Sequence, residues 1–457
     1  MKTLSIVIFL VLPFSSGFSQ SALVLEGGTL IDGTGGVPVR NSAIIISGGK
    51  IIATGKTGKI KAPKGAKKIN LKGKFIIPGL TDANACYDSP KDMVQLLAWG
   101  VTSANLTLGS AESALRLERG SRDESNHYPR ITVTAPVFAG KPGWWRGREL
   151  VPDSGIDPFP STPQDAKETV RKLREMNIGR ICILYDSMAW CRSPLPPLNH
   201  MRKDVMAALI REARANGMSP YIMTAGLRDA FEAVDYGPAA FMTGILDKRT
   251  GQPFINALEG RGIFFIPDFC LFAFLSDVYG FVQSVLAERS FKSALPDDEV
   301  VRFLDPEFYN RLREKHPNGR FVLANLQNLD FNFRKMLKAE EEEEKEEEED
   351  AGGRLSVSVA TGSGVWILPG IVMHLEIERM VDAGLTPMQA IEAATRVGAR
   401  FLGTENETGT IEKGKKADLI VLSGDPLSDI RNTRKIEMIM KEGLIYRHAD
   451  LINESKR

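Results

Sequence analysis

Cysteine and histidine are scarce in this sequence of 457 residues, which contains four cysteines and five histidines. No pair of cysteines has Cys-x-x-Cys spacing, which excludes a zinc ribbon built from cysteines. Four cysteines in so long a chain also imply no disulfide framework of the kind that holds small secreted domains together. No two histidines are two residues apart, so one strand cannot present a histidine pair to a metal.

Long apolar runs and a strong net charge are also missing. Beyond the first twenty residues no stretch approaches the roughly 18 apolar residues of a membrane-spanning helix. The net charge is +1, which gives no reason to expect nucleic acid or an anionic membrane as a partner. The run 340–350 holds nine Glu, one Asp and one Lys. We expect it to be a solvated helix extension or a disordered insert, and the compensating positive charge to be spread over an ordinary surface.

The N-terminus has the pattern of a secretory signal peptide. Lys2 precedes the apolar stretch Leu4–Phe14, and Gly17 and Ser19 form a small-x-small cleavage site. We therefore predict that residues 1–19 are a signal peptide and that the protein is secreted, to the periplasm. The alternative is that this segment forms a buried N-terminal strand.

The pattern of expected secondary structure changes twice along the rest of the chain. Short strand patterns separated by glycine turns come first, strands alternating with helices follow, and short strands return after residue 409. Alternating strands and helices predict an α/β fold, a (β/α)₈ barrel of the TIM type. We expect the barrel over residues 77–404, and a small composite β-sandwich domain formed by residues 21–76 and 405–450. The strands predicted for the barrel are 75–81, 101–106, 130–137, 180–185, 220–224, 239–243, 262–267 and 355–361. The clearest helices are 162–176, 203–216, 226–236 and 306–338.

Five motifs resemble those of one enzyme family. They are Gly-Gly-Thr-Leu-Ile-Asp-Gly-Thr-Gly at 27–35, Ser-Gly-Gly-Lys-Ile-Ile-Ala-Thr-Gly at 47–55, Ile-Ile-Pro-Gly-Leu-Thr-Asp at 76–82, Ala-Gly-Leu-Thr-Pro-Met-Gln-Ala at 383–390 and Gly-Thr-Ile with Gly-Lys-Lys-Ala-Asp-Leu-Ile-Val-Leu between 409 and 422. The chain resembles the metal-dependent amidohydrolase superfamily, and within it the imidazolonepropionase-like and prolidase-like branch. The resemblance implies hydrolysis of carbon–nitrogen bonds other than peptide bonds.

The resemblance also implies a metal site, which this sequence does not carry. Family members bind one or two divalent metals through a His-x-His pair on strand 1, a carboxylated lysine on strand 4, histidines on strands 5 and 6, and an aspartate on strand 8. The corresponding positions here are Asn84, Cys86, Cys182, Thr224, Thr243 and Gly362. We therefore expect no metal cofactor.

Cys86 and Cys182 leave three interpretations open. They are small buried side chains, the two halves of a disulfide across the barrel, or a thiolate site for zinc. The disulfide requires Cα atoms within about 7 Å, and a zinc site needs a third ligand such as Asp82 or His374.

Other residues of the expected barrel mouth are candidates for a ligand pocket. Trp144, Trp145 and Arg146 follow strand 3, and Asp268 follows strand 7 together with Phe269, Phe272, Phe274 and Tyr279. In a barrel the loops after the strands hold the ligand. The alternative for the aromatic residues is packing of a lid or of a subunit interface. For His374 it is packing at the start of a helix.

These observations favour a degenerate, metal-free amidohydrolase that acts as an exported binding or partner protein. The alternative is an active hydrolase of cyclic amides or dipeptide-like substrates with a non-standard site. We expect a small-molecule ligand, no nucleic acid and no membrane span. The sequence leaves a homo-oligomer open.

Overall fold

The computed structural model describes residues 22–107, 111–135, 137–140, 156–187, 199–258, 261–315, 319–346, 356–357 and 368–456. The predicted signal peptide lies outside these residues.

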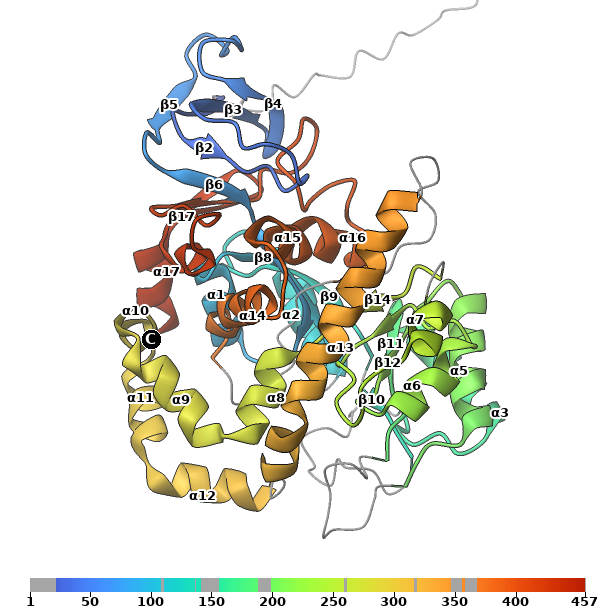
Figure 1. The fold of residues 1–457 in the computed structure, drawn as a ribbon. Coiled ribbons are helices and arrows are strands. Elements are labelled where there is room, and N and C mark those ends of the chain that lie inside the picture. The colour runs from blue at the N-terminus through green and yellow to red at the C-terminus, as the bar shows by residue number, and fades with distance from the viewer. Residues whose placement is uncertain are drawn as a thin grey trace, which may run out of the picture.

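Both ends of the chain contribute to one β unit, which forms the upper end of the molecule in Figure 1. Its first sheet has the order β4 (Lys50–Lys56), β3 (Ser42–Ser47), β1 (Leu23–Glu26) and β5 (Lys67–Asn70). Its second sheet has the order β18 (Leu444–Arg447), β17 (Ile436–Lys441), β16 (Leu419–Leu422), β6 (Phe75–Pro78) and β2 (Thr29–Leu30). The predicted pairing of the two termini in one sheet is confirmed.

The two sheets share an apolar core. Alternate residues of the strands point to the same face, and the buried members of this core come from both ends of the chain. They are Leu25, Leu30, Ile44, Ile46, Ile51, Leu71, Ile76, Ile411, Ala417, Leu419, Val421 and Met440. The N-terminal and C-terminal segments therefore depend on each other for burial of their apolar side chains.

The barrel strands run parallel and pair in sequence order. They are β7 (Leu80–Ala85), β8 (Val101–Leu106), β9 (Arg130–Val133) with β10 (Val137–Phe138), β11 (Arg180–Leu184), β12 (Ser219–Met223), β13 (Ala240–Phe241), β14 (Phe264–Phe265) and β15 (Ser356–Val357). The fold class is confirmed as a mixed α/β fold. Within the described residues no hydrogen-bond ladder joins β15 to β7, so the barrel is not closed between these two strands.

Helices between and after these strands cover the outside of the sheet (Figure 1). Up to β14 they are α1 (Pro90–Ala98), α2 (Ala111–Gly120), α3 (Pro163–Glu175), α5 (Lys203–Ala215), α6 (Leu227–Val234) and α7 (Gln252–Leu258). After it come α8 (Phe269–Ser276), α9 (Val278–Ala287), α10 (Arg289–Ala294), α11 (Asp297–Leu304), α12 (Pro306–Lys315), α13 (Gly319–Glu346), α14 (Ile371–Asp382), α15 (Pro387–Glu392), a π-helical turn Ala393–Val397, α16 (Gly398–Leu402), the 3₁₀ helix η3 (Ile430–Arg434) and α17 (His448–Ser455).

Three helices begin with the same local device. The caps Ser89, Thr162 and Thr386 each precede a proline and form a capping box with the residue three positions later. The proline has no N–H to leave unsatisfied, and the cap accepts a backbone hydrogen bond in its place. The predicted start of α3 at Thr162 is confirmed.

The strand predicted over residues 75–81 is divided between the two sheets. Phe75–Pro78 belongs to the terminal β unit as β6, and the first barrel strand begins at Leu80. Gly79 joins them, and a Cβ there would lie 2.2 Å from the hydroxyl oxygen of Thr102. Only glycine allows the chain to pass so close to β8 at this crossing.

The region after β14 is more helical than the sequence predicts. Phe269, Phe272 and Phe274 belong to the buried side of α8, not to an open loop. The helix predicted over 306–338 is two helices, α12 and α13, and α13 extends to Glu346 within the acidic run. In the described part of the chain no single helix could cross a membrane by length and hydropathy, and only α8 and α9 taken together pass, with a 113° bend between them.

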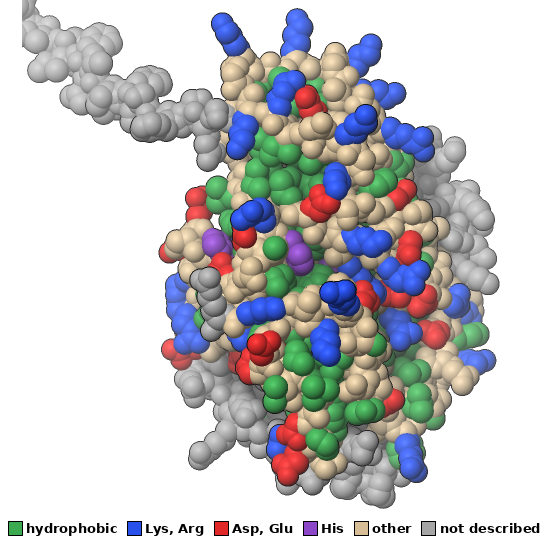
Figure 2. Space-filling view, turned by 90° about the vertical axis from the view of Figure 1, so that its left-hand side faces the viewer, with side chains coloured by type: hydrophobic (Ala, Val, Ile, Leu, Met, Phe, Trp, Pro, Cys, Tyr) green, Lys and Arg blue, Asp and Glu red, His purple; other side chains and the backbone are tan. Residues whose placement is uncertain are grey.

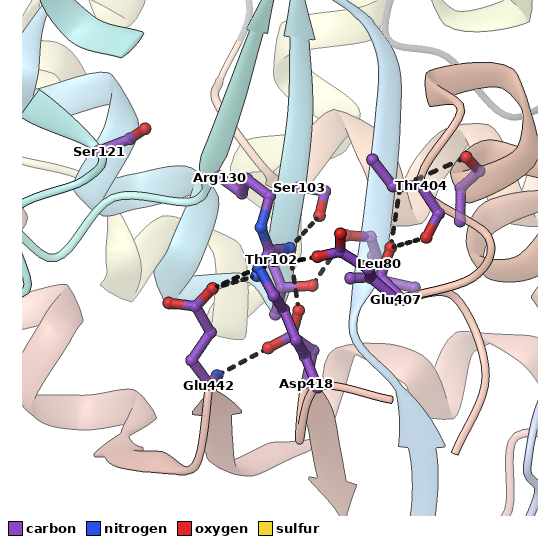
Figure 3. Close-up of polar contacts among 12 residues, drawn as sticks. Leu80, Thr102, Ser103, Ser121, Arg130, Thr404, Glu407, Asp418 and Glu442 are labelled. Atoms are coloured by element: carbon purple, nitrogen blue, oxygen red, sulfur yellow. Dashed lines mark hydrogen bonds and ion pairs between the residues drawn. The ribbon is translucent and has the colours of Figure 1, made fainter. Parts of the chain in front are cut away.

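Arg130 ties the barrel to the terminal β unit (Figure 3). From β9 its guanidinium reaches Asp418 at 3.0 Å and Glu442 at 2.7 Å. Asp418 is 4% exposed, and its other carboxylate oxygen accepts the backbone N–H of Glu442 at 2.7 Å. Partial burial opposes ionisation of Glu442, but hydrogen bonds from Arg130 and Lys416 lower its pKa to about 2.

His374 also lies at this junction. Its Nε2 is 3.0 Å from the carbonyl oxygen of Trp99, just before β8, and its Nδ1 is 3.1 Å from the hydroxyl of Thr433 in η3. The imidazole packs edge-on against the Trp99 ring. Burial lowers its pKa to about 3, so the ring is neutral and its Nε2–H donates to Trp99.

Replacing Arg130 tests the junction. We expect Arg130→Met to lower the free energy of unfolding by about 3 kcal/mol, because it leaves the buried Asp418 charge without its partner. The matched control is Arg122→Met, which removes an exposed pair with Glu118 and should cost less than about 0.5 kcal/mol. Urea unfolding of the three proteins measures both values, and equal losses would contradict the assignment.

The lowered pKa of the buried His374 predicts that the stability of the protein falls as the pH is lowered. Its folded pKa lies below the unfolded value of about 6.5, so its contribution is complete above that pH and is lost as the pH falls towards 3. Between pH 6.5 and 5 the wild type should lose about 2 kcal/mol that His374→Gln does not lose. Urea unfolding at several pH values measures the difference, with His127→Gln as control. Parallel curves for wild type and His374→Gln would refute the assignment.

Candidate functional site

A buried amide–carboxyl pair marks the carboxyl-terminal end of the barrel strands. Asn84, at the end of β7, donates from Nδ2 to Oδ2 of Asp268 at 3.0 Å. Asp268 follows β14 and precedes α8. Asn84 is 1% exposed and Asp268 is 0% exposed. The structure thus joins two sequence candidates that are 184 residues apart.

The backbone around Asp268 is held in an unusual geometry. Asp268 has a φ of 52°, in the left-handed region that aspartate tolerates better than most residues. The next two N–H groups, of Phe269 and Cys270, donate to the Glu376 carboxylate at 2.9 and 2.8 Å. Glu376 belongs to α14 and caps the start of α8, so it fixes the direction in which Asp268 projects.

Burial makes the carboxyl groups of this site weak acids. The pKa of Asp268 is raised well above its usual range by burial first, and then by the neighbouring Glu376 and Asp82. Burial raises the pKa of Glu376 to about 7, although the two N–H groups oppose the shift. A protonated Asp268 is a hydrogen-bond donor as well as an acceptor.

Two oxygens of the pair have no hydrogen-bond partner among the residues that the structure describes. They are Oδ1 of Asn84 and Oδ1 of Asp268, both buried. Buried polar atoms in folded proteins are nearly always hydrogen-bonded, so such exceptions require an explanation. A bound polar molecule would supply the missing partners.

Asp82 and Cys86 flank Asn84 on the same strand end. Oδ1 of Asp82 accepts the backbone N–H of Asn84 at 3.0 Å, which orders the strand end. Sγ of Cys86 lies 3.8 Å from the carbonyl oxygen of Asn84. Both side chains therefore interact with the backbone of the residue between them.

Cys182 lies inside the barrel among apolar residues. Its cluster includes Ala83, Tyr221, Met242 and Ile266. Burial, and then the nearby Asp268, raise the pKa of its thiol to about 12. No disulfide joins Cys86 to Cys182, so the interpretation as a disulfide across the barrel is wrong. This environment matches the interpretation as a small buried side chain.

The hydroxyls of Thr224 and Thr243 form hydrogen bonds around the end of β12. The Thr243 hydroxyl donates to the carbonyl oxygen of Thr224 at 2.7 Å and accepts its N–H at 3.1 Å. The Thr224 hydroxyl accepts the N–H of Gly226 at 3.2 Å. These hydroxyls stabilise the ends of β12 and β13.

Several other residues that the sequence indicated as site candidates are not placed beside the Asn84–Asp268 pair by the described structure. Trp144, Trp145, Arg146 and Gly362 lie outside the described residues. His374 contacts Trp99 and Thr433 at the junction with the β unit, as described above. Tyr279 lines a separate surface groove of about 360 Å³ with Gln283, Leu304, Pro306, Tyr309 and Asn310.

The structure adds polar residues that the sequence did not single out. Glu376 is one of these residues. His200 and Asp229 are two others, and the distance between His200 Nε2 and Asp229 Oδ2 is 3.2 Å. The Tyr185 ring packs edge-on against the His200 imidazole, with 4.3 Å between the ring centroids. Burial opposes protonation of His200, but its contact with Asp229 raises the pKa of the imidazole. Because Tyr185 directly follows β11 and Asp229 lies early in α6 after β12, position after a strand was the signal that could have found them.

These residues do not fit the metal centre of the family. Among the described residues no three His, Cys, Asp or Glu side chains are arranged to hold a metal ion. Metals bind the thiolate form of cysteine, and the raised pKa keeps Cys182 a thiol. Thr224 and Thr243 use their hydroxyls in the strand-end hydrogen bonds, and Asn84 offers only an amide.

Comparison with known proteins gives a sequence match in the C-terminal part of the chain. Residues 346–445 match the model of the amidohydrolase family. The ochratoxinase of Aspergillus niger is 30% identical over 100 residues, which are 21% of this chain and 21% of the ochratoxinase. The match thus spans about a fifth of that relative's length.

Solved structures are similar over nearly the whole chain. A Xaa-Pro dipeptidase with bound methionine has a TM-score of 0.71 at 18% identity, with 93% of this chain and 100% of the other covered. A molinate hydrolase has 0.71 at 18%, covering 95% and 96%. The A. niger ochratoxinase structure has 0.67 at 16%, covering 93% and 96%. The chain therefore has the fold of the amidohydrolase superfamily, and its residues 346–445 carry the sequence pattern of the amidohydrolase family.

Proposed function

We propose that this protein is a metal-free member of the amidohydrolase fold that binds a small amide-like molecule at the Asn84–Asp268 pair. The observation that carries the proposal is the pair of buried oxygens without partners, Asn84 Oδ1 and Asp268 Oδ1. They lie at the carboxyl-terminal end of the strands, where barrels of this type bind their ligands.

The chemistry of the pair selects the ligand class. Asn84 Oδ1 accepts a hydrogen bond, and a protonated Asp268 donates one from Oδ1. A carboxamide or cyclic amide offers an N–H and a C=O side by side, which match these two atoms. An anionic ligand is disfavoured, because the charge of Asp82 already raises the pKa of both Asp268 and Glu376.

Loss of metal chemistry supports binding rather than hydrolysis. In this family a metal-bound water is the nucleophile, and an aspartate on strand 8 accepts its proton. Here the corresponding positions are neutral or buried thiols, and the strand 8 position is Gly362. A missing general base alone typically slows such a reaction about 10²–10⁴-fold.

Export is part of the same proposal. Lys2, the apolar stretch Leu4–Phe14 and the small residues Gly17 and Ser19 support a cleaved signal peptide. A binding or partner protein outside the cytoplasm would meet small amides or peptide fragments there.

Elemental analysis tests the metal-free state. We expect protein produced with added zinc to retain less than about 0.2 equivalents of Zn, Mn, Fe or Ni after gel filtration, because a zinc site needs three or four ligands. Cys86→Ser and Cys182→Ser should then leave the metal content unchanged, as should the control Cys270→Ser. One equivalent of zinc that is lost in the first two variants and kept in the control would overturn the metal-free proposal and favour the hydrolase.

Ligand binding tests the pair directly. The probes are acetamide, 2-pyrrolidinone and an N-acetyl dipeptide amide, followed by saturation-transfer NMR. We expect at least one probe to bind, with Asn84→Leu weakening it about tenfold or more through loss of a buried hydrogen bond. Asp268→Asn should retain binding, since its amide N–H replaces the carboxyl donor. Cys182→Ala is the control in the same interior, and equal loss in that variant would contradict the assignment.

A hydrolase remains the second candidate because of the His200–Asp229 pair. His200 Nδ1 faces the carbonyl oxygen of Met201 at 2.8 Å, so Nε2, beside Asp229, is the nitrogen that would exchange a proton with a substrate as a general acid or base. Hydrolysis of the N-acetyl dipeptide amide that disappears in His200→Gln but persists in His374→Gln would favour this candidate.

A further inference from the structure

Lysine dominates one stretch of the terminal β unit. Residues 50–74 contain nine lysines and neither aspartate nor glutamate. Residues 22–76 as a whole hold ten basic and two acidic residues, a net charge of +8. The expectation that the positive charge is spread over an ordinary surface is therefore wrong, because most of it is concentrated here.

The fold gathers these lysines at one end of the molecule. They come from β4, β5, the loop 57–66 that joins these two edge strands, and the turn after Leu71. Figure 2 shows basic side chains projecting from this upper end. We name the lysine face by seven exposed members: Lys50, Lys56, Lys59, Lys61, Lys64, Lys67 and Lys72.

The lysine face is not neutralised by the protein itself. Lys68 pairs with Glu26 at 3.0 Å, and Lys74 pairs with Glu437. The seven members of the face form no ion pair with any residue that the structure describes, and on the loop Gly58 and Gly65 face open space. Seven like charges held together destabilise the fold unless an external anion compensates them.

The composition of the face favours lipid over nucleic acid. Residues 50–74 contain no arginine and no aromatic residue. Nucleic-acid sites generally combine arginine with aromatic side chains that stack on bases. Lysine alone, together with the 43% exposed Ile52 on β4, suits the diffuse negative field and apolar boundary of a bilayer.

We infer that the lysine face binds the surface of an anionic phospholipid membrane and holds the protein there reversibly. The negative surface potential of such a membrane attracts clusters of lysine side chains. The barrel mouth and its Asn84–Asp268 pair do not take part, so this inference is independent of the proposed ligand.

Vesicle co-sedimentation of the protein without its predicted signal peptide, residues 1–19, tests the inference. The vesicles are phosphatidylcholine with or without phosphatidylglycerol. We expect binding to the anionic vesicles only, and release near 1 M salt, where screening acts over about 3 Å. The triple variant Lys59→Gln, Lys61→Gln, Lys64→Gln should bind about 100-fold more weakly, from about fivefold per lysine.

The control carries the same change of charge elsewhere. Lys167→Gln, Lys248→Gln, Lys292→Gln replaces three exposed lysines of the barrel region and should bind like the wild type. Since the three proteins differ only at these lysines, a difference in binding between them comes from the lysines. Circular dichroism and thermal unfolding verify that each is folded.

Three outcomes would overturn the inference. Equal binding to neutral vesicles would show that the charge of the lysine face does not drive the attachment. Retention on double-stranded DNA at a salt concentration that releases the vesicles would make the face a nucleic-acid site. Salt-sensitive self-association without vesicles would instead assign the face to the acidic run of a second copy.

Discussion

The pairing of β6 with β16 is the constraint on which the rest of the structure depends. Ile76 and Ile77 of β6 lie opposite Val421 and Ile420 in an antiparallel ladder, which joins segments more than 340 residues apart. Only Gly79 separates β6 from β7, so the first barrel strand starts at a fixed place relative to the C-terminal segment. A slip of this ladder by one residue would turn the side chains of β6 to the wrong face and displace Asn84 with its strand.

Helix α14 carries the same constraint to the candidate site. His374, one turn into the helix, bonds to Trp99 and Thr433 at the junction with the β unit. Two residues later, the Glu376 carboxylate accepts the first two N–H groups of α8 and so fixes the position of Asp268, which precedes that helix. One rigid element thus fixes both the domain junction and the carboxyl group of the pair. Buried carboxyl groups with raised pKa values destabilise a fold, so Asp268 and Glu376 are candidates for a function that needs them.

The sequence predicts the architecture well because local pattern and topology agree in it. The barrel strands 101–106 and 180–185 and the helix that starts at Thr162 were predicted at nearly their observed limits. Helix α8 was missed for a physical reason. Its sequence, Phe-Cys-Leu-Phe-Ala-Phe-Leu-Ser, is apolar on every side, so it lacks the periodicity that distinguishes a surface helix. The split at Gly79 was missed because β6 and β7 are separated by this one residue, with no loop between the two strands.

Sequence alone identified the members of the candidate site but not their partners. Asn84 and Asp268 were separate candidates, and only the ring of strands brings them to 3.0 Å. Glu376 and the His200–Asp229 pair depend on contacts across helices that no local pattern records. Thr224 and Thr243 lie at strand ends, as the sequence predicted. Their hydroxyls form hydrogen bonds within the protein, which the sequence did not predict.

The net charge of +1 conceals a division of charge within the chain. The run 340–350 carries −9, and residues 22–76 carry +8. The two charges cancel in the net charge of the whole chain, and this small net charge gave no reason to expect an anionic partner. A total for the whole chain hides such local differences, because the electrostatic field of a face extends only about 8 Å into solution at physiological salt. The partner of a protein is therefore set by the charge of the face it presents, and here the face of β4, β5 and their loop is basic whatever the total.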